Sequence, residues 1–69
     1  METRYSVVGM TCQHCVTHVR QEVEALDEVM SVDIDLSGLM VVHSKAAIDF
    51  SSIQDAVSEA GNYTVIACD

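Results

Sequence analysis

Basic side chains are scarce in this chain of 69 residues, where three Lys or Arg face eleven Asp or Glu. The formal net charge is −8 at pH 7 with histidine neutral. Such a chain repels a phosphate backbone instead of neutralising it, so we expect no nucleic acid partner. An acidic surface favours docking against a basic patch on another protein, through steering that salt weakens.

Chain breakers and long apolar runs are also scarce. The sequence has no proline and three glycines, so we expect few breaks between elements. No run approaches the ~20 apolar residues of a membrane span, and residues 1–5 carry mixed charge where a signal peptide is apolar. Hydrophobic residues make up 49% of the chain, which excludes a disordered tail. We therefore expect one small, soluble, cytoplasmic domain over residues 1–69, without membrane insertion.

Cysteine occurs three times, at Cys12, Cys15 and Cys68. The first two form a C-x-x-C motif, and in a reducing cytosol this is more often a metal or redox site than a structural disulfide. A structural zinc site needs four ligands, and half of them are missing here. Soft thiolates select soft ions, and two sulfurs alone suit an ion that accepts near-linear coordination. The motif therefore predicts a Cu(I) site at Cys12 and Cys15.

Hydrophobic periodicity predicts six elements in the order strand, helix, strand, strand, helix, strand. Alternation predicts strands at residues 5–8, 31–36, 39–43 and 63–68, with Ser37-Gly38 as the tight turn of a hairpin. In the second strand the apolar face is made by Val32, Ile34 and Leu36. Apolar residues at steps of three and four predict helices over about residues 14–26 and 50–60. The buried stripe of the first helix is made by Val16, Val19, Val23 and Leu26. Ser51 and Gln54 fit a capping box for the second helix, and Gly61 ends it. In the first helix, His14 and His18 are expected to face water.

This order predicts an α+β fold, the ferredoxin-like βαββαβ sandwich, with a four-stranded antiparallel sheet and both helices on one face. The alternating directions place the cysteine loop, the Ser37-Gly38 turn and the Asn62-Tyr63 junction at one end. His43 and Cys68 belong at the other end. Since five strand residues span about 17 Å at ~3.3 Å each, Cys68 cannot ligate an ion held by the C-x-x-C motif. We expect a structural role for it.

Several motifs together resemble the heavy-metal-associated domain family, and the resemblance covers nearly the whole chain. They are Gly9-Met10-Thr11-Cys12-Gln13-His14-Cys15-Val16, the segment Val32-Asp33-Ile34-Asp35-Leu36 before the glycine turn, and Glu59-Ala60-Gly61 before Tyr63. Within that family, the length resembles free bacterial copper chaperones. Thr11 before the first cysteine resembles the copper branch, since zinc and cadmium relatives commonly carry Asp there. Asn62 and Glu28 depart from the family pattern, which usually has Gly-Tyr in sequence and a glycine before the second strand.

The resemblance implies Cu(I) bound by Cys12 and Cys15, and delivery to the N-terminal domains of a copper-transporting P-type ATPase or to a copper-responsive repressor. At a helix start, unpaired N–H groups and the helix dipole stabilise thiolates. A two-coordinate ion stays open to a third sulfur, so transfer becomes ligand exchange. A metal-bridged homodimer through shared thiolates is a further option that the sequence leaves open.

Other side chains near the motif are weaker candidates for binding the metal or tuning the site. Met10 carries a soft thioether, but methionine is a common core filler and in the family this side chain packs under the loop. His14 could tune the loop or bind a second ion, although exposed histidines mostly face solvent. His14 and His18 have a spacing that can hold zinc, yet two ligands make a weak site. Tyr63 either shields the metal or covers the core end.

The acidic run at Glu22, Glu24, Asp27 and Glu28 could be a docking face, but such charge usually solvates a helix. No catalytic residues are predicted, and we expect a copper chaperone instead of an enzyme. The alternatives are a metal-binding domain of a longer P-type ATPase, a small dithiol redox protein and a mercury carrier. A thioredoxin-like fold needs a longer chain and a cis-proline, and this chain has no proline.

Overall fold

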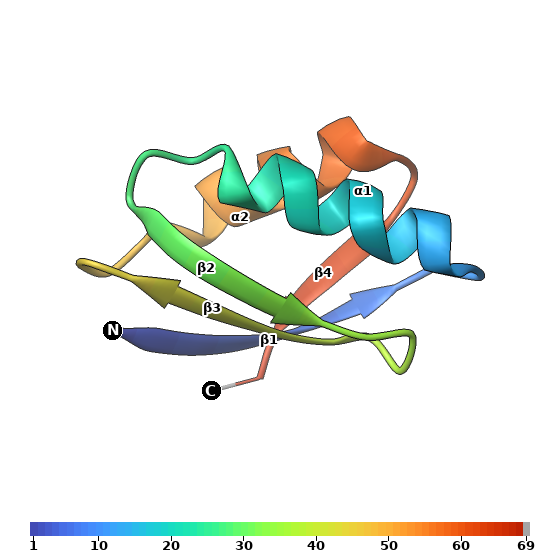
Figure 1. Ribbon diagram of the computed structural model, residues 1–69, viewed down its shortest axis with the longest axis horizontal. Coiled ribbons are helices and arrows are strands. Elements are labelled where there is room, and N and C mark those ends of the chain that lie inside the picture. Colours follow the sequence, from blue (N-terminus) through green and yellow to red (C-terminus); the bar gives the residue numbers. More distant parts are fainter. Residues whose placement is uncertain (69) are drawn as a thin grey trace.

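Four strands and two helices follow one another in the predicted order in the computed structural model, which describes residues 1–68 (Figure 1). Asp69, the last residue of the predicted domain, lies outside the described residues. The elements are β1 (Glu2–Val8), α1 (Gln13–Glu24), β2 (Val29–Ile34), β3 (Leu39–Ser44), α2 (Phe50–Ala60) and β4 (Thr64–Ala67). The strands form one antiparallel sheet in the order β2-β3-β1-β4, and both helices cover the same face (Figure 1). The predicted fold class is confirmed.

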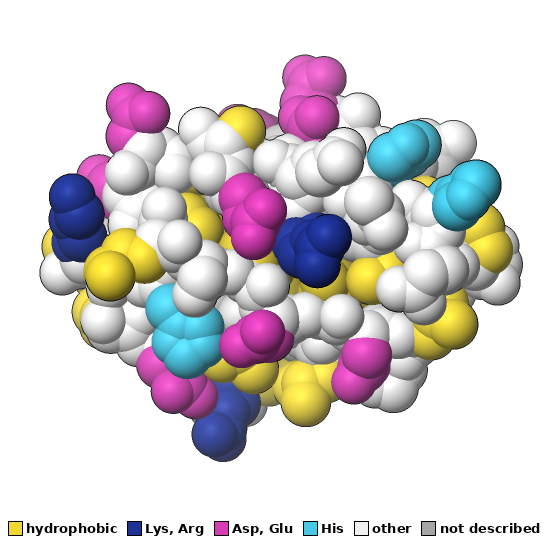
Figure 2. All heavy atoms as spheres, in the orientation of Figure 1, with side chains coloured by type: hydrophobic (Ala, Val, Ile, Leu, Met, Phe, Trp, Pro, Cys, Tyr) yellow, Lys and Arg dark blue, Asp and Glu magenta, His cyan; other side chains and the backbone are white. Residues whose placement is uncertain are grey.

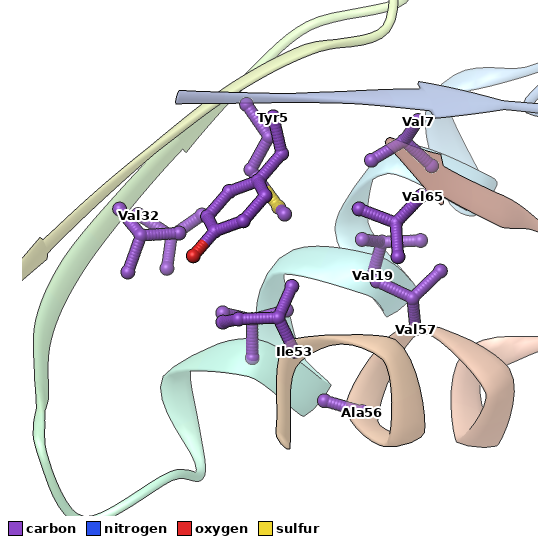
Figure 3. Close-up of a cluster of buried hydrophobic side chains, with 11 residues drawn as sticks. Tyr5, Val7, Val19, Val32, Ile53, Ala56, Val57 and Val65 are labelled. Carbon is purple, nitrogen blue, oxygen red and sulfur yellow. The ribbon is translucent and has the colours of Figure 1, made fainter. Parts of the chain in front are cut away.

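The core lies between the sheet and the two helices, where the side chains labelled in Figure 3 meet. Tyr5 and Val7 of β1 are buried, whereas Val8 is 54% exposed, as the alternation predicts. From the helix side, α1 contributes the predicted stripe of Val16, Val19 and Val23. Burial of this apolar face holds the helices in place, because short helices are marginal on their own.

Both histidines predicted to face water, His14 and His18, are exposed. Leu26, placed at the end of the same stripe, lies beyond α1 and is partly buried against the core. No helix in residues 1–68 combines the length and the apolar character that crossing a membrane requires.

The boundaries of β1 and β2 differ from the predicted ones, because pairing with β3 decides where these strands begin. β1 begins at Glu2 because Glu2 pairs with His43, and the Met1 carbonyl accepts from the Ser44 N–H at 2.8 Å. β2 is shifted toward the N-terminus and has an irregularity between Val29 and Ser31. Local periodicity could not reveal these partners, which lie more than ten residues away along the chain.

Leu36, predicted to point into the core from the second strand, lies outside it and is 49% exposed. The chain turns at this point: the Gly38 N–H donates to the Asp35 carbonyl at 3.1 Å, and the Ser37 N–H donates to Asp35 Oδ1 at 2.9 Å. Gly38 has a φ of +99°, which favours glycine. The hairpin prediction holds, and the turn takes Leu36 out of the alternation.

The capping box predicted at Ser51 and Gln54 is wrong. α2 starts at Phe50, as the helical period predicts, but its N-cap is Asp49, two residues before Ser51, and no side-chain capping bond is present. The Asp49 carbonyl accepts from the N–H groups of Ser52 and Ile53, at 3.0 and 3.4 Å. The centroid of the Phe50 ring lies 6.2 Å from that of the Tyr5 ring. The start of α2 therefore has an aromatic contact with β1 instead of the predicted side-chain cap.

Three connections share one end of the molecule, on the right of Figure 1: the β1–α1 loop, the β2–β3 turn and the α2–β4 junction. The Val7 N–H donates to the Gly38 carbonyl at 2.8 Å, which ties the β2–β3 turn to the end of β1. Cys68 donates its N–H to the Arg4 carbonyl at 3.0 Å, nearer the other end of β1. Both placements agree with the predicted strand directions.

Candidate metal centre

The two cysteines of the C-x-x-C motif occupy the start of α1. Cys12 is the N-cap residue, with extended backbone angles of φ −152° and ψ 169°. Its carbonyl accepts from the N–H groups of Cys15 and Val16, at 3.1 and 3.4 Å, so Cys15 lies in the first helical turn. α1 has no acidic side chain in this turn and no side-chain cap. The positive end of the helix dipole is therefore left for an anion, and a thiolate fits it.

The two sulfur atoms lie 3.5 Å apart. Cys12 is exposed and Cys15 is half-buried, and both are free thiols. Within residues 1–68, no group of three or more His, Cys, Asp or Glu side chains could hold a metal ion. A closed four-ligand zinc site is thus absent from this part of the chain. The geometry offers two sulfur donors at the surface, open on the solvent side.

The pKa of the Cys15 thiol is lowered to about 6. The largest cause is a hydrogen bond from the Tyr63 side chain, followed by a backbone hydrogen bond at Thr11 and the neighbouring Cys12 thiol. Each of these favours the charged form, and they outweigh a small opposing effect of desolvation. Cys15 is therefore mostly thiolate at neutral pH, and the thiolate is the form that binds metal.

Tyr63 lies against the β1–α1 loop, which carries Cys12. A Cβ placed on Gly9 would come within 3.3 Å of Tyr63 Cδ1, and one on Gly61 within 2.8 Å of Tyr63 Cε2. The ring thus packs against two positions without side chains, one before the loop and one after α2. The pKa of the Tyr63 phenol is raised, first by its hydrogen bond to Cys15, because the neutral phenol is the donor. The residue inserted at Asn62 does not prevent this contact.

The other predicted neighbours of the site are placed as follows. Met10 is partly buried and packs against the core cluster, in line with the filler role. Thr11 is exposed, and its backbone contributes to the lowered pKa of Cys15. His14 is exposed in the first turn of α1, one residue before Cys15.

Two further groups lie apart from the site. Cys68 is exposed and free, in line with β4 running away from the loop. The acidic run is exposed and lies at and beyond the C-terminal end of α1, at Glu22, Glu24, Asp27 and Glu28.

Gly9 and Gly61 are parts of the site that sequence reasoning missed. Both have positive φ, of +109° and +157°, and both lie next to the Tyr63 ring. The sequence marks them only as element ends, since Gly9 follows β1 and Gly61 follows α2. Gly61 is two residues from Tyr63 in the chain, whereas Gly9 comes near the same ring because β1 pairs with β4 in the sheet.

Two relatives align with this chain over most of their length. A COP-associated protein of Helicobacter felis is 36% identical over 62 residues, covering 88% of this chain and 94% of the relative. The copper chaperone CopZ of Enterococcus hirae is 30% identical over 63 residues, covering 88% of this chain and 91% of the relative. Both alignments span almost the whole of each relative.

A solved structure agrees with this result. The fold is similar to that of a CopZ metallochaperone with a TM-score of 0.84 and 28% identity, over 96% of this chain and all of that one. The heavy-metal-associated domain matches residues 4–63, which include both cysteines and Tyr63. On this evidence of sequence and fold, the chain belongs to the heavy-metal-associated domain family.

Proposed function

We propose that this chain is a single heavy-metal-associated domain that acts as a cytosolic copper chaperone. In this proposal Cys12 and Cys15 hold Cu(I) and pass it on to the N-terminal domain of a copper-transporting P-type ATPase or to a copper-responsive regulator. The observation that carries the proposal is the pair of surface sulfurs 3.5 Å apart at the start of α1, where the pKa of Cys15 is about 6.

The choice of ion follows from the donors. Thiolates select Cu(I) over hard cations, and a two-sulfur site without a third donor suits the low coordination number that Cu(I) accepts. Zn(II) in structural sites takes four ligands, and residues 1–68 offer no such group. The name of the Enterococcus hirae relative, copper chaperone CopZ, supports the same ion.

Transfer would proceed by exchange of sulfur ligands. A thiolate of the acceptor forms a bond to the bound Cu(I), and then one of the bonds to Cys12 or Cys15 breaks. No electron is transferred, so copper stays monovalent throughout. The hydrogen bond from the Tyr63 hydroxyl stabilises part of the negative charge on Cys15 and thereby weakens the donation of electrons from this sulfur to the ion.

An anaerobic titration of Cu(I) against a competing chelator tests the ligand assignment. The wild-type chain should bind one equivalent through sulfur donors alone, as X-ray absorption can verify. Cys12→Ser and Cys15→Ser should each abolish this binding. Cys68→Ser, the matched control just after the end of β4, should leave it unchanged. Undiminished affinity in either motif variant, or oxygen and nitrogen donors in the loaded protein, would refute the proposal.

A second candidate function is dithiol redox chemistry, because two sulfurs 3.5 Å apart and a thiol pKa of about 6 also suit disulfide exchange. An insulin-reduction assay with a thiol reductant separates the two. Turnover that depends on Cys12 and Cys15 would favour the redox role over the chaperone. A third reading, a domain of a longer ATPase, is decided by whether the reading frame continues into membrane segments.

A further inference from the structure

A second pair of metal-binding side chains lies on α1, outside the C-x-x-C motif. His14 and His18 are both exposed, and together with Thr17 and Gln21 they line one surface hollow. Figure 2 shows two histidine side chains side by side over the N-terminal half of α1, the helix end at the right of Figure 1. The pair is therefore accessible from solvent as one unit.

These two imidazoles are not engaged elsewhere in the described residues. The only histidine in an ion pair within residues 1–68 is His43, whose Nε2 lies 3.3 Å from Asp33 Oδ2. Thr17, which lines the same hollow, donates its hydroxyl to the Gln13 carbonyl at 3.1 Å and so does not bond to either imidazole. Both rings keep a nitrogen free for an incoming ion.

Helix geometry brings the two rings together. Residues four apart lie on one face of a helix with Cβ atoms about 5–6 Å apart, the spacing by which H-x-x-x-H helices chelate zinc. The helix is fixed on its other side by Val16, Val19 and Val23, which are at most 3% exposed. Because the backbone is already held, an ion has to order only two short side chains.

The chemistry of the donors points to a divalent ion. Imidazole suits Zn(II) and its neighbours, whereas soft monovalent copper prefers the thiolates. The positive end of the α1 dipole opposes a cation near His14, but the net charge of −8 favours one. With two imidazoles bound, two positions of a four-coordinate zinc remain for water. Such a site exchanges its ion readily, unlike a closed structural site.

We propose that His14 and His18 form a second metal site, independent of the cysteines, that binds one Zn(II) ion through both imidazoles. This site does not rest on the proposed chaperone function, because the thiols take no part in it. It would allow the chain to hold a divalent ion and a thiolate-bound ion at the same time.

Zinc titration by isothermal titration calorimetry at mildly alkaline pH tests the site in the full chain carrying Cys12→Ser and Cys15→Ser. One equivalent should bind, and the His14 and His18 ring signals should shift in NMR spectra. His14→Gln and His18→Gln should each weaken binding at least tenfold, whereas His43→Gln should not change it. Should the serine variant fail to fold, the wild-type chain with alkylated thiols serves instead, since Cys12 and Cys68 are exposed and Cys15 is half-buried.

The matched control is the double variant His18→Gln with Gln21→His. It keeps composition and charge, but it separates the two histidines by seven residues, about 10.5 Å along the axis at 1.5 Å per residue, too far for one ion. Binding should fall at least tenfold in this variant. Equal zinc affinity in the double variant would mean that zinc is attracted to the acidic surface alone. Absence of zinc binding in the chain that lacks the Cys12 and Cys15 thiols would overturn the site outright.

Discussion

At the scale of single residues, Tyr63 has the largest effect on the chemistry of the candidate centre. Its hydrogen bond is the first cause of the lowered pKa of Cys15. We expect Tyr63→Phe to raise the pKa of Cys15 above its value of about 6, because the thiolate loses its strongest donor. Cys15 would then be less ionised at neutral pH, and its reaction with iodoacetamide would require a higher pH.

The measurement is the rate of Cys15 alkylation against pH, resolved by mass spectrometry in a Cys68→Ser background. Tyr5→Phe is the control, since Tyr5 is buried in the core and its side-chain hydrogen-bond partner is Thr3. If the alkylation rate of Tyr63→Phe has its inflection at the same pH as the wild-type rate, the backbone at Thr11 and the Cys12 thiol suffice to lower the pKa of Cys15.

At the scale of elements, the β2–β3 turn depends on Gly38. A Cβ there would lie 2.5 Å from the Val7 carbonyl oxygen, and the residue has a φ of +99°. The Val7 N–H also donates to the Gly38 carbonyl, so the two backbones cannot separate without loss of that bond. We expect Gly38→Ala to lower the free energy of unfolding by about 1–3 kcal/mol, from strain and overpacking together.

Urea unfolding followed by circular dichroism checks this value. Ser58→Ala, an exposed position within α2, is the control and should change the free energy of unfolding by less than about 0.5 kcal/mol. A comparable effect in the two variants would contradict the close approach of the turn to β1.

At the scale of the whole molecule, stability depends on a small core. Ile53 is fully buried where α2 faces the sheet (Figure 3). Ile53→Ala should cost about 2–5 kcal/mol, against a total of roughly 3–10 kcal/mol for a domain of 69 residues. The metal-free variant should therefore lose a large share of its stability and melt at a lower temperature than the wild-type chain.

Cu(I) should raise the melting temperature of this variant, because an ion that binds only the folded chain stabilises it, by ~2.7 kcal/mol at a hundredfold excess over Kd. Thermal melts of Ile53→Ala with and without Cu(I) measure the recovery. Ile53→Val, expected to lose about 0.5–1.5 kcal/mol, is the matched control that keeps most of the packing. A melting temperature of Ile53→Ala that Cu(I) does not raise would contradict binding coupled to the folded state.

The order of elements and the position of the cysteine pair could be predicted from the sequence because both depend on local spacing. The stripe of Val16, Val19 and Val23 has the helical period, and the alternation around Tyr5 has the strand period, so each segment indicates its buried face by itself. Strand directions follow from that order, which is why the end of the molecule that carries the cysteines was also predictable.

Features that depend on contacts between distant segments were decided by the tertiary structure. The start of β1 depends on the backbone bond with Ser44. At the start of α2, Phe50 contacts the Tyr5 ring, and no side-chain cap is present. The position of the Tyr63 ring depends on Gly9, which is 54 residues away in sequence (63 − 9) and comes near the ring because β4 pairs with β1. The sequence by itself therefore determined which thiols are available and at which end of the fold. The acidity of Cys15 was decided by the folded chain, because it depends on a hydroxyl that only the sheet brings within reach.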